Sequence, residues 1–186
     1  MNLVPQMIGR HPGPSSGFTM IEMIVTMAVA GILTALAVPA FQSFIQNDRD
    51  ITQINSLVLS LNYARSEAVK RNVATGITVC PSSDGATCNG TASWSNGWIV
   101  TDNLAPTPTV LQAVPALSGT NTVTSGAVSA VVFRSSGQVA PQLLVKVCDP
   151  RGATYARDVE VSLLGRVAAS QTHGYQVDNV TPLVCP

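Results

Sequence analysis

One acidic residue lies where an acidic residue is costly. Glu22 is the only charged side chain among the twenty-one residues from Phe18 to Val38. A helix over this apolar run would be roughly 30 Å long, which matches the hydrocarbon core of a bilayer. Because an ionisable group is expensive inside a membrane, it usually marks a functional position there. The sequence therefore singles out Glu22 as its main candidate for chemistry.

Patterns typical of enzymes and metal sites are missing from the sequence. It contains no H-E-x-x-H, G-x-S-x-G, P-loop or G-x-G-x-x-G motif. His11 and His173 are its only histidines, and a lone histidine is far more often a surface residue than a catalytic one. Asp149, Asp158 and Glu160 lack the spacing of a calcium loop. We therefore expect no catalytic residue, metal, cofactor or small-molecule substrate.

Two ordinary interpretations of the apolar run leave Glu22 unexplained. The run could be a plain signal anchor. It could also be a cleaved secretory signal that leaves a soluble periplasmic domain, because Ala35-Leu36-Ala37 fits an A-x-A site and Arg10 lies before the run. In that case Glu22 would oppose insertion and then be removed, so the acid would serve no purpose.

The residues around Glu22 resemble the class III signal of type IV pilins and the related pseudopilins. They read Gly17-Phe18-Thr19-Met20-Ile21-Glu22 and precede an apolar helix, although Ser15-Ser16 stand where many such leaders carry Lys or Arg. The resemblance implies that prepilin peptidase cuts between Gly17 and Phe18 and that the new Phe18 amine is N-methylated. Glu22 is then fifth in the mature chain and Pro39 twenty-second, where pilins carry a glutamate and a helix-loosening proline.

An acid at this position suits assembly. Glu22 lies about 6 Å along the helix from Phe18, so it stays near the membrane surface in a monomer. Within a bundle, its carboxylate can pair with the cationic Phe18 amine of a neighbouring subunit, where the low dielectric strengthens the attraction. We expect this pair to set the axial register of each incoming helix.

Beyond Pro39, which should bend or loosen the helix, the helical pattern becomes amphipathic. One helix from Phe18 to Asn72 would be about 82 Å long, a length that suits a filament subunit. Its predicted core-facing band consists of Phe41, Phe44, Ile51, Ile54, Leu57, Val58, Leu61, Ala64 and Ala68.

From about Thr75 the pattern changes to strands separated by turns. Residues 158–163 alternate between polar and apolar side chains, which predicts one wet face and one buried face. Residues 134–138 predict a hairpin turn, and residues 103–126 predict one short strand with loops that the sequence does not place. The other predicted strands are TGITVC, GWIVTD, TVLQAV, VSAVVF and LLVKV.

Residues 78–100, TVCPSSDGATCNGTASWSNGWIV, resemble the head of the GspH/FimT/FimU-type minor pilins and pseudopilins. This resemblance implies an α+β type IV pilin fold, in which a long N-terminal helix packs on an antiparallel β-sheet head with two disulfides. We therefore expect a removed leader (1–17), a transmembrane helix (18–39), an amphipathic helix (40–73) and a periplasmic β-rich head (74–186).

The four cysteines lie beyond the apolar run, which favours disulfides in an oxidising compartment. Zinc is the weaker alternative, because there is no C-x-x-C pair. Four cysteines allow three pairings; closeness in sequence favours Cys80–Cys88, which leaves Cys148–Cys185.

Nucleic acid is a disfavoured partner. The whole chain has ten basic and ten acidic side chains, and residues 73–186 carry five cations against six anions. Some FimT-like minor pilins take up DNA through a Gly-Arg-x-Arg segment. This chain reads Gly165-Arg166-Val167-Ala168 and so has only the first arginine. If DNA were bound, Arg151, Arg157 and Arg166 would be the candidates.

The resemblance implies a minor pilin in the tip complex that primes a type IV pilus. The alternatives are an H-type minor pseudopilin of type II secretion and, less favoured, a DNA-binding minor pilin for transformation. The expected partners are other minor and major pilins or pseudopilins, prepilin peptidase and the inner-membrane assembly platform. The expected location is the bacterial inner membrane, crossed once with the head in the periplasm, or the assembled filament.

Overall fold

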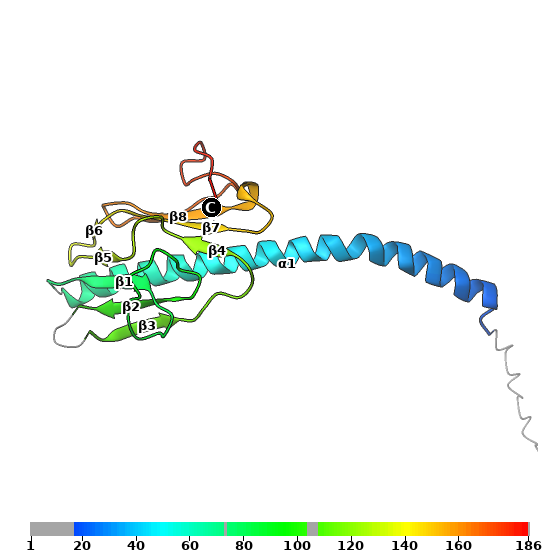
Figure 1. Ribbon diagram of the computed structural model, residues 1–186, viewed down its shortest axis with the longest axis horizontal. Helices are drawn as coiled ribbons and strands as arrows, with labels where there is room; N and C mark the ends of the chain where they lie inside the picture. Colours follow the sequence, from blue (N-terminus) through cyan, green and yellow to red (C-terminus); the bar gives the residue numbers. More distant parts are fainter. Residues whose placement is uncertain (1–16, 73, 104–107, 186) are drawn as a thin grey trace, which may run out of the picture. The chain divides into compact units, whose positions relative to one another are not determined.

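A computed structural model describes residues 17–72, 74–103 and 108–185 (Figure 1). The chain divides into two compact units, Met1–Phe44 and Ile45–Pro186. Of the predicted leader, Gly17 alone is among the described residues. Arg10 and His11 lie outside them.

The helix α1 spans Met20–Arg71 and continues through Pro39 without a break. It ends at Asn72, whose backbone φ of 50° is left-handed, a conformation that asparagine tolerates better than most residues. Glu67 lies one turn before two cations, with Lys70 Nζ at 3.5 Å and Arg71 Nε at 2.6 Å from its carboxylate oxygens. The prediction of one long helix is confirmed.

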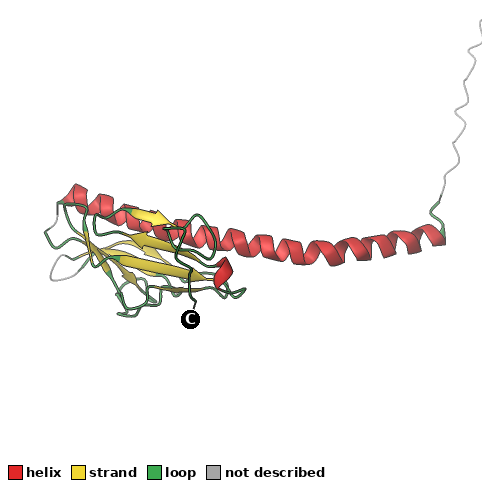
Figure 2. Cartoon of the chain, turned by 90° about the horizontal axis from the view of Figure 1, so that it is seen from above, coloured by secondary structure: helices red, strands yellow, loops and turns green. Residues whose placement is uncertain are grey.

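The head contains two antiparallel sheets (Figures 1 and 2). The first has the strand order β3-β2-β1-β5-β6 and the second β4-β7-β8-β9. Figure 2 shows the strands gathered beside the C-terminal part of α1. The strands of the first sheet are β1 (Ile77–Pro81), β2 (Trp98–Asp102), β3 (Val110–Val114), β5 (Val131–Phe133) and β6 (Val139–Ala140). Those of the second are β4 (Thr122–Thr124), β7 (Leu143–Cys148), β8 (Arg157–Val161) and β9 (Val167–Ala169), with the short 3-10 helix η1 (Ala153–Tyr155) before β8.

One hydrophobic core joins α1 to side chains from both sheets. Trp94 and Trp98 are fully buried in it, with their ring centroids 6.4 Å apart. The indole N–H of Trp94 donates to Ser125 Oγ at 2.9 Å, so this buried donor is satisfied. The residues that α1 contributes to the core are Ile54, Leu57, Leu61, Ala64 and Ala68.

The predicted helical band is correct in its second half and wrong in its first. Phe41, Phe44 and Ile51 are exposed, whereas Asp50 and Gln53 are buried. A seven-residue repeat would place the whole band on one side of the helix, but a straight helix drifts by about 20° per heptad relative to such a repeat. In addition, Phe41 and Phe44 belong to the unit Met1–Phe44 rather than to the head.

The prediction of a wet face on residues 158–163 is wrong at Asp158, which is completely buried. Its amide donates to Ser170 Oγ at 3.0 Å, and the amide of Ser170 donates back to the Asp158 carbonyl at 2.9 Å. The segment from Ser170 onward is thus hydrogen-bonded to β8 at Asp158. The strand itself ends at Val161.

The predicted hairpin turn at residues 134–138 is confirmed. The amide of Arg134 donates to the Gln138 carbonyl at 2.8 Å, and Gly137 adopts φ 78°. The strands β4, β6 and β9 have two or three residues each, which is too short for the alternation on which the strand predictions rest.

Candidate functional site

The N-terminal motif forms a reciprocal cap at the start of α1. The amide of Glu22 donates to Thr19 Oγ1 at 3.3 Å, and the amide of Thr19 donates to Glu22 Oε2 at 3.5 Å. Threonine at the N-cap and glutamate three residues later are the two members of a capping box. This role is absent from the predictions above, although T-x-x-E before an apolar run is its recognised signal.

The cap fixes where the Glu22 carboxylate lies. Thr19 precedes the first helical residue, Met20, so Glu22 stands in the first turn. The unsatisfied N–H groups of a helix start carry partial positive charge, which favours a carboxylate there. The side chain is therefore held beside the residues that would become the mature N-terminus.

Residues 17–45 are all exposed in the isolated chain. Among the described residues, α1 is the one helix long and apolar enough to cross a membrane. Its hydroxyl groups are satisfied internally: Thr26 donates to the Met23 carbonyl at 2.9 Å, and Thr34 donates to the Ala30 carbonyl at 2.8 Å. Neither hydroxyl needs a water molecule as a partner, so both can be placed in a bilayer or a helix bundle, where water is absent.

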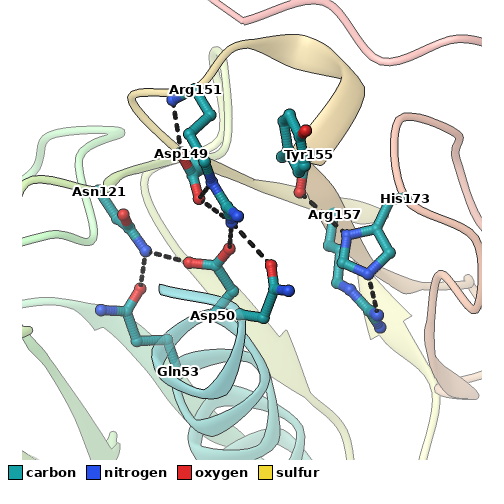
Figure 3. A network of polar contacts seen from close by, with 9 residues as sticks. Asp50, Gln53, Asn121, Asp149, Arg151, Tyr155, Arg157 and His173 are labelled. Atoms are coloured by element: carbon teal, nitrogen blue, oxygen red, sulfur yellow. Dashed lines mark hydrogen bonds and ion pairs between the residues drawn. The ribbon is translucent and has the colours of Figure 1, made fainter. Parts of the chain in front are cut away.

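A buried polar network joins α1 to two loops of the head (Figure 3). The Arg151 guanidinium contacts Asp149 through both Nε and a terminal nitrogen, and its terminal nitrogen lies 3.4 Å from Asp50 Oδ2. The side-chain amide nitrogen of Asn121, Nδ2, donates to Asp50 Oδ1 at 2.5 Å and to Gln53 Oε1 at 2.9 Å. Both helix residues are thus tied to partners about seventy to one hundred positions away in the sequence.

We give the name helix lock to this polar network. Its two carboxylates, those of Asp50 and Asp149, differ in acidity. Burial raises the pKa of Asp50 above its ordinary value, and the neighbouring Asp149 raises it further. Burial also acts on Asp149, but hydrogen bonds from the side chain and backbone of Arg151 hold its pKa below the ordinary value. Arg151 therefore pairs chiefly with Asp149. The helix lock consists of Asp50, Gln53, Asn121, Asp149 and Arg151.

The three arginines proposed as DNA contacts differ in their exposure and in their partners. Arg151 points into the helix lock and stacks on Tyr155, with its guanidinium carbon 4.2 Å from the ring centroid. Arg157 is half-buried, and one of its terminal nitrogens lies 2.7 Å from His173 Nε2. Of the three, Arg166 alone is exposed.

Disulfides join Cys80 to Cys88 and Cys148 to Cys185, the pairs favoured by the sequence. They close loops with sequence separations of 8 and 37 residues. Loop-closure entropy gives about 2.5 and 4 kcal/mol of stabilisation respectively. The second bridge fastens the C-terminal segment to the end of β7, where Cys148 packs with Ala156 and Leu183.

In the described part of the chain, no three His, Cys, Asp or Glu residues cluster as metal ligands would. The contacts of His173 with Arg157 and with the Tyr155 carbonyl, 3.3 Å from Nδ1, tie the C-terminal segment to β8 and to η1.

Comparison with known proteins agrees with this architecture. The model of the family described as type II transport protein GspH matches residues 53–165, and that of the prokaryotic N-terminal methylation motif matches residues 14–38. No curated protein matches the chain. Two crystal forms of the type IV minor pilin FimU from Pseudomonas aeruginosa (strain PAO1) share its fold at 23% identity. Their TM-scores are 0.51 and 0.54, with 63% and 69% of this chain and 90% and 98% of the FimU chains covered.

These matches fit a structural subunit that assembles with other pilins. The methylation motif and the apolar start of α1 fit a pilin anchored in the inner membrane, with a soluble head. The family model covers 113 of the 186 residues, well over half (165 − 53 + 1 = 113). The chain therefore belongs to the GspH family of pilins and pseudopilins, with the α+β fold of a type IV pilin.

Proposed function

We propose that the chain is a minor pilin of a type IV pilus and that it acts in the tip complex that primes filament assembly. The observation that carries this proposal is the capped N-terminal motif. It heads an apolar helical segment that is exposed over residues 17–45, and the same helix continues into a head with two disulfides. The exposed apolar surface of this segment needs lipid or other helices to cover it.

Processing at Gly17 prepares the chain for assembly. Prepilin peptidase removes residues 1–17, and methylation modifies the new Phe18 amine. The mature chain then consists of a membrane segment (18–39), an amphipathic helix (40–73) and the head (74–186). Gly17 has no heavy atom within 4 Å of the place where a Cβ would lie, apart from its chain neighbours. Gly17 is also exposed, as a cleavage site must be.

Glu22 acts as the docking residue of the mature chain. Cleavage creates a cation at Phe18, and the Glu22 carboxylate pairs with that cation on a neighbouring subunit. The attraction between unit charges is several times stronger near or inside a low-dielectric bundle than in water. Pro39 lacks one backbone donor and so gives the helix a weak point at which it adjusts to its neighbours.

The helix lock keeps the head on the same helix that enters the filament. Asp50 and Asp149 are buried carboxylates and Arg151, whose side chain is 18% exposed, is their cation, so removal of Arg151 leaves two buried charges uncompensated. Docking through Glu22 therefore brings a firmly attached head to its partners, which are other pilins together with the assembly platform.

The likeness in fold to FimU supports the pilus. The matched family's description as a type II transport protein supports the alternative, an H-type minor pseudopilin of the secretion system. DNA uptake is less favoured, because Arg166 alone of its three candidate arginines is exposed.

Deletion of the gene in a host with pilus retraction blocked tests the proposal. We expect filaments recovered by shearing to fall sharply and to return when the wild-type chain is supplied. Normal filament numbers would contradict the pilus role. A simultaneous loss of exported enzyme activity would then assign the chain to the secretion system.

A further inference from the structure

We propose that a rigid surface at the C-terminal end of α1 docks a protein partner that offers carboxylates around an apolar pocket. We call this surface the arginine–leucine surface; it consists of Arg65, Arg134, Leu163, Leu164 and Arg166. The identity of the partner as another filament subunit rests on the proposed function.

Three segments that are distant in sequence meet at this surface. The Arg65 guanidinium on α1 donates to the Leu164 carbonyl at 3.5 Å. A Cβ at Gly165 would lie 1.8 Å from the Gly137 carbonyl oxygen, so the turns 134–138 and 162–166 pack directly on each other. A Cβ at Gly137 would in turn lie 3.3 Å from Arg65 Nε. The helix and both turns therefore form one platform.

The platform holds two leucines out into solvent. The exposed fractions of Leu163 and Leu164 are 57% and 71%. Their turn is fixed by backbone hydrogen bonds: the Val139 amide donates to the Leu163 carbonyl at 3.1 Å, and the Gly165 amide donates to the Ser162 carbonyl at 2.7 Å. Because the turn is already ordered, binding through these leucines loses little conformational entropy.

The charges around the leucines are unbalanced. At this end of the head the acids Glu67 and Asp102 both pair with Arg71, Glu67 also pairs with Lys70, and the Glu160 carboxylate accepts a hydrogen bond from Gln142. In the described residues, no ion pair involves Arg65, Arg134 or Arg166. An excess of positive charge favours a partner with the opposite charge, both in the rate of encounter and in the choice of partner.

The two leucines favour a protein over a nucleic acid. Single-stranded nucleic acids bind by stacking bases on aromatic side chains and by contacts of cations with phosphates. The arginine–leucine surface has no aromatic member, and its two exposed leucines would gain little from phosphates. An apolar pocket rimmed by Asp and Glu would use both the leucines and the arginines.

Photo-crosslinking in the host tests this inference with the full-length chain. A photo-reactive amino acid replaces Leu164, and the crosslinked peptide is identified by mass spectrometry. We expect a crosslink to a filament subunit, within a segment that contains Asp or Glu. The double variant Arg134→Glu/Arg166→Glu should lower the yield about tenfold, whereas Arg134→Lys/Arg166→Lys should retain it, because lysine keeps the charge. Replacement of the partner's acids by lysine should restore the crosslink to the Glu variant.

Several outcomes would overturn the inference: a nuclease-sensitive or lipid adduct, a yield unaffected by charge reversal, or no adduct while the chain is present in sheared filaments. The last outcome would leave the proposed function intact. Conversely, the expected crosslink from a chain that never enters filaments would support the surface and contradict the proposed function. Equal membrane levels of all variants, with both disulfides formed, exclude misfolding as the cause of a lost crosslink.

Discussion

Thr19 and Glu22 cap each other across the first turn of α1, with each backbone amide bonded to the other residue's side chain. This relationship gives Glu22 two separable roles. Glu22 caps the N-terminus of α1 in the monomer, and its carboxylate offers a negative charge to a neighbouring subunit. Because glutamine can replace glutamate in a capping box, the cap and the charge can be tested with different substitutions.

Thr19→Ala should affect the cap and spare assembly. The variant removes the acceptor of the Glu22 amide, which should weaken the helix start by about 0.5–2 kcal/mol. We expect faster hydrogen exchange at the Glu22 amide of the protein in detergent micelles, with nearly normal recovery in sheared filaments. Loss from filaments equal to that of a charge variant at Glu22 would show that the cap, rather than the charge, is what assembly needs.

Arg151→Met should destabilise the head strongly. The substitution keeps much of the side-chain volume but leaves Asp149 and Asp50 buried without their cation. Breaking a buried ion pair from one side typically costs about 3–5 kcal/mol. Chemical unfolding of the full chain in detergent measures the loss. Arg134→Met is the matched control, because Arg134 is exposed, and it should change stability by less than about 0.5 kcal/mol. Equal stability of the two variants would contradict the helix lock.

Asp158→Asn should stabilise the protein at neutral pH. Burial raises the pKa of Asp158 to about 6 from an ordinary value of 3.8; polar contacts with Ser170 and Val177 reduce the rise, and nearby Glu160 and Asp178 add to it. The contacts with Ser170 and Val177 are weak, because neither carboxylate oxygen makes a hydrogen bond of good geometry within the described residues. The contribution of Asp158 to stability is therefore fully present below about pH 4 and is lost as the pH rises through about 6. The shift corresponds to about 2–3 kcal/mol above pH 6.

The unfolding free energy of wild type and Asp158→Asn, measured from pH 4 to pH 8, checks this sign. The two curves should converge near pH 4 and separate above pH 6, with the variant more stable. Asp178→Asn is a control of opposite sign, because hydrogen bonds from Thr181 lower the pKa of Asp178. Its effect should be a loss of stability that is constant from pH 8 down to about pH 4, because a lowered pKa removes the contribution of Asp178 only below its ordinary value of 3.8. A constant offset for Asp158→Asn across the range would contradict the assignment.

Gly165→Ala should disturb the turn that carries the exposed leucines. Gly165 has φ 74°, and an added Cβ would meet the Gly137 carbonyl oxygen at 1.8 Å. Backbone would have to move, so we expect a loss of about 1–3 kcal/mol in unfolding free energy. Gly126→Ala is the control, because Gly126 also has a positive φ but nothing within 4 Å of the added atom. A similar loss for both variants would mean that the turns 134–138 and 162–166 are not packed together.

Features set by neighbouring residues could be predicted from the sequence. The motif at residues 17–22, the single helix and the longer strands each depend on a local pattern, and the structure contains them. The mutual cap of Thr19 and Glu22 was equally local, and the T-x-x-E signal would have revealed it.

Features set by distant residues could not be predicted. Arg151 looked like a free cation because its partner Asp50 lies about one hundred positions away. Asp158 looked solvent-exposed because strand alternation does not reveal that the segment from Ser170 onward lies beside it.

The most direct test of the central claim is the amount of Glu22→Gln variant recovered in sheared filaments, relative to the amount of cleaved protein in the membrane. Glutamine keeps the cap and removes the charge, so membrane insertion and leader cleavage should stay at wild-type levels. Incorporation into filaments should fall about tenfold or more, as expected for the loss of an ion pair in a low-dielectric bundle. Incorporation of Glu22→Gln at the wild-type level would contradict the account of Glu22 as the docking residue.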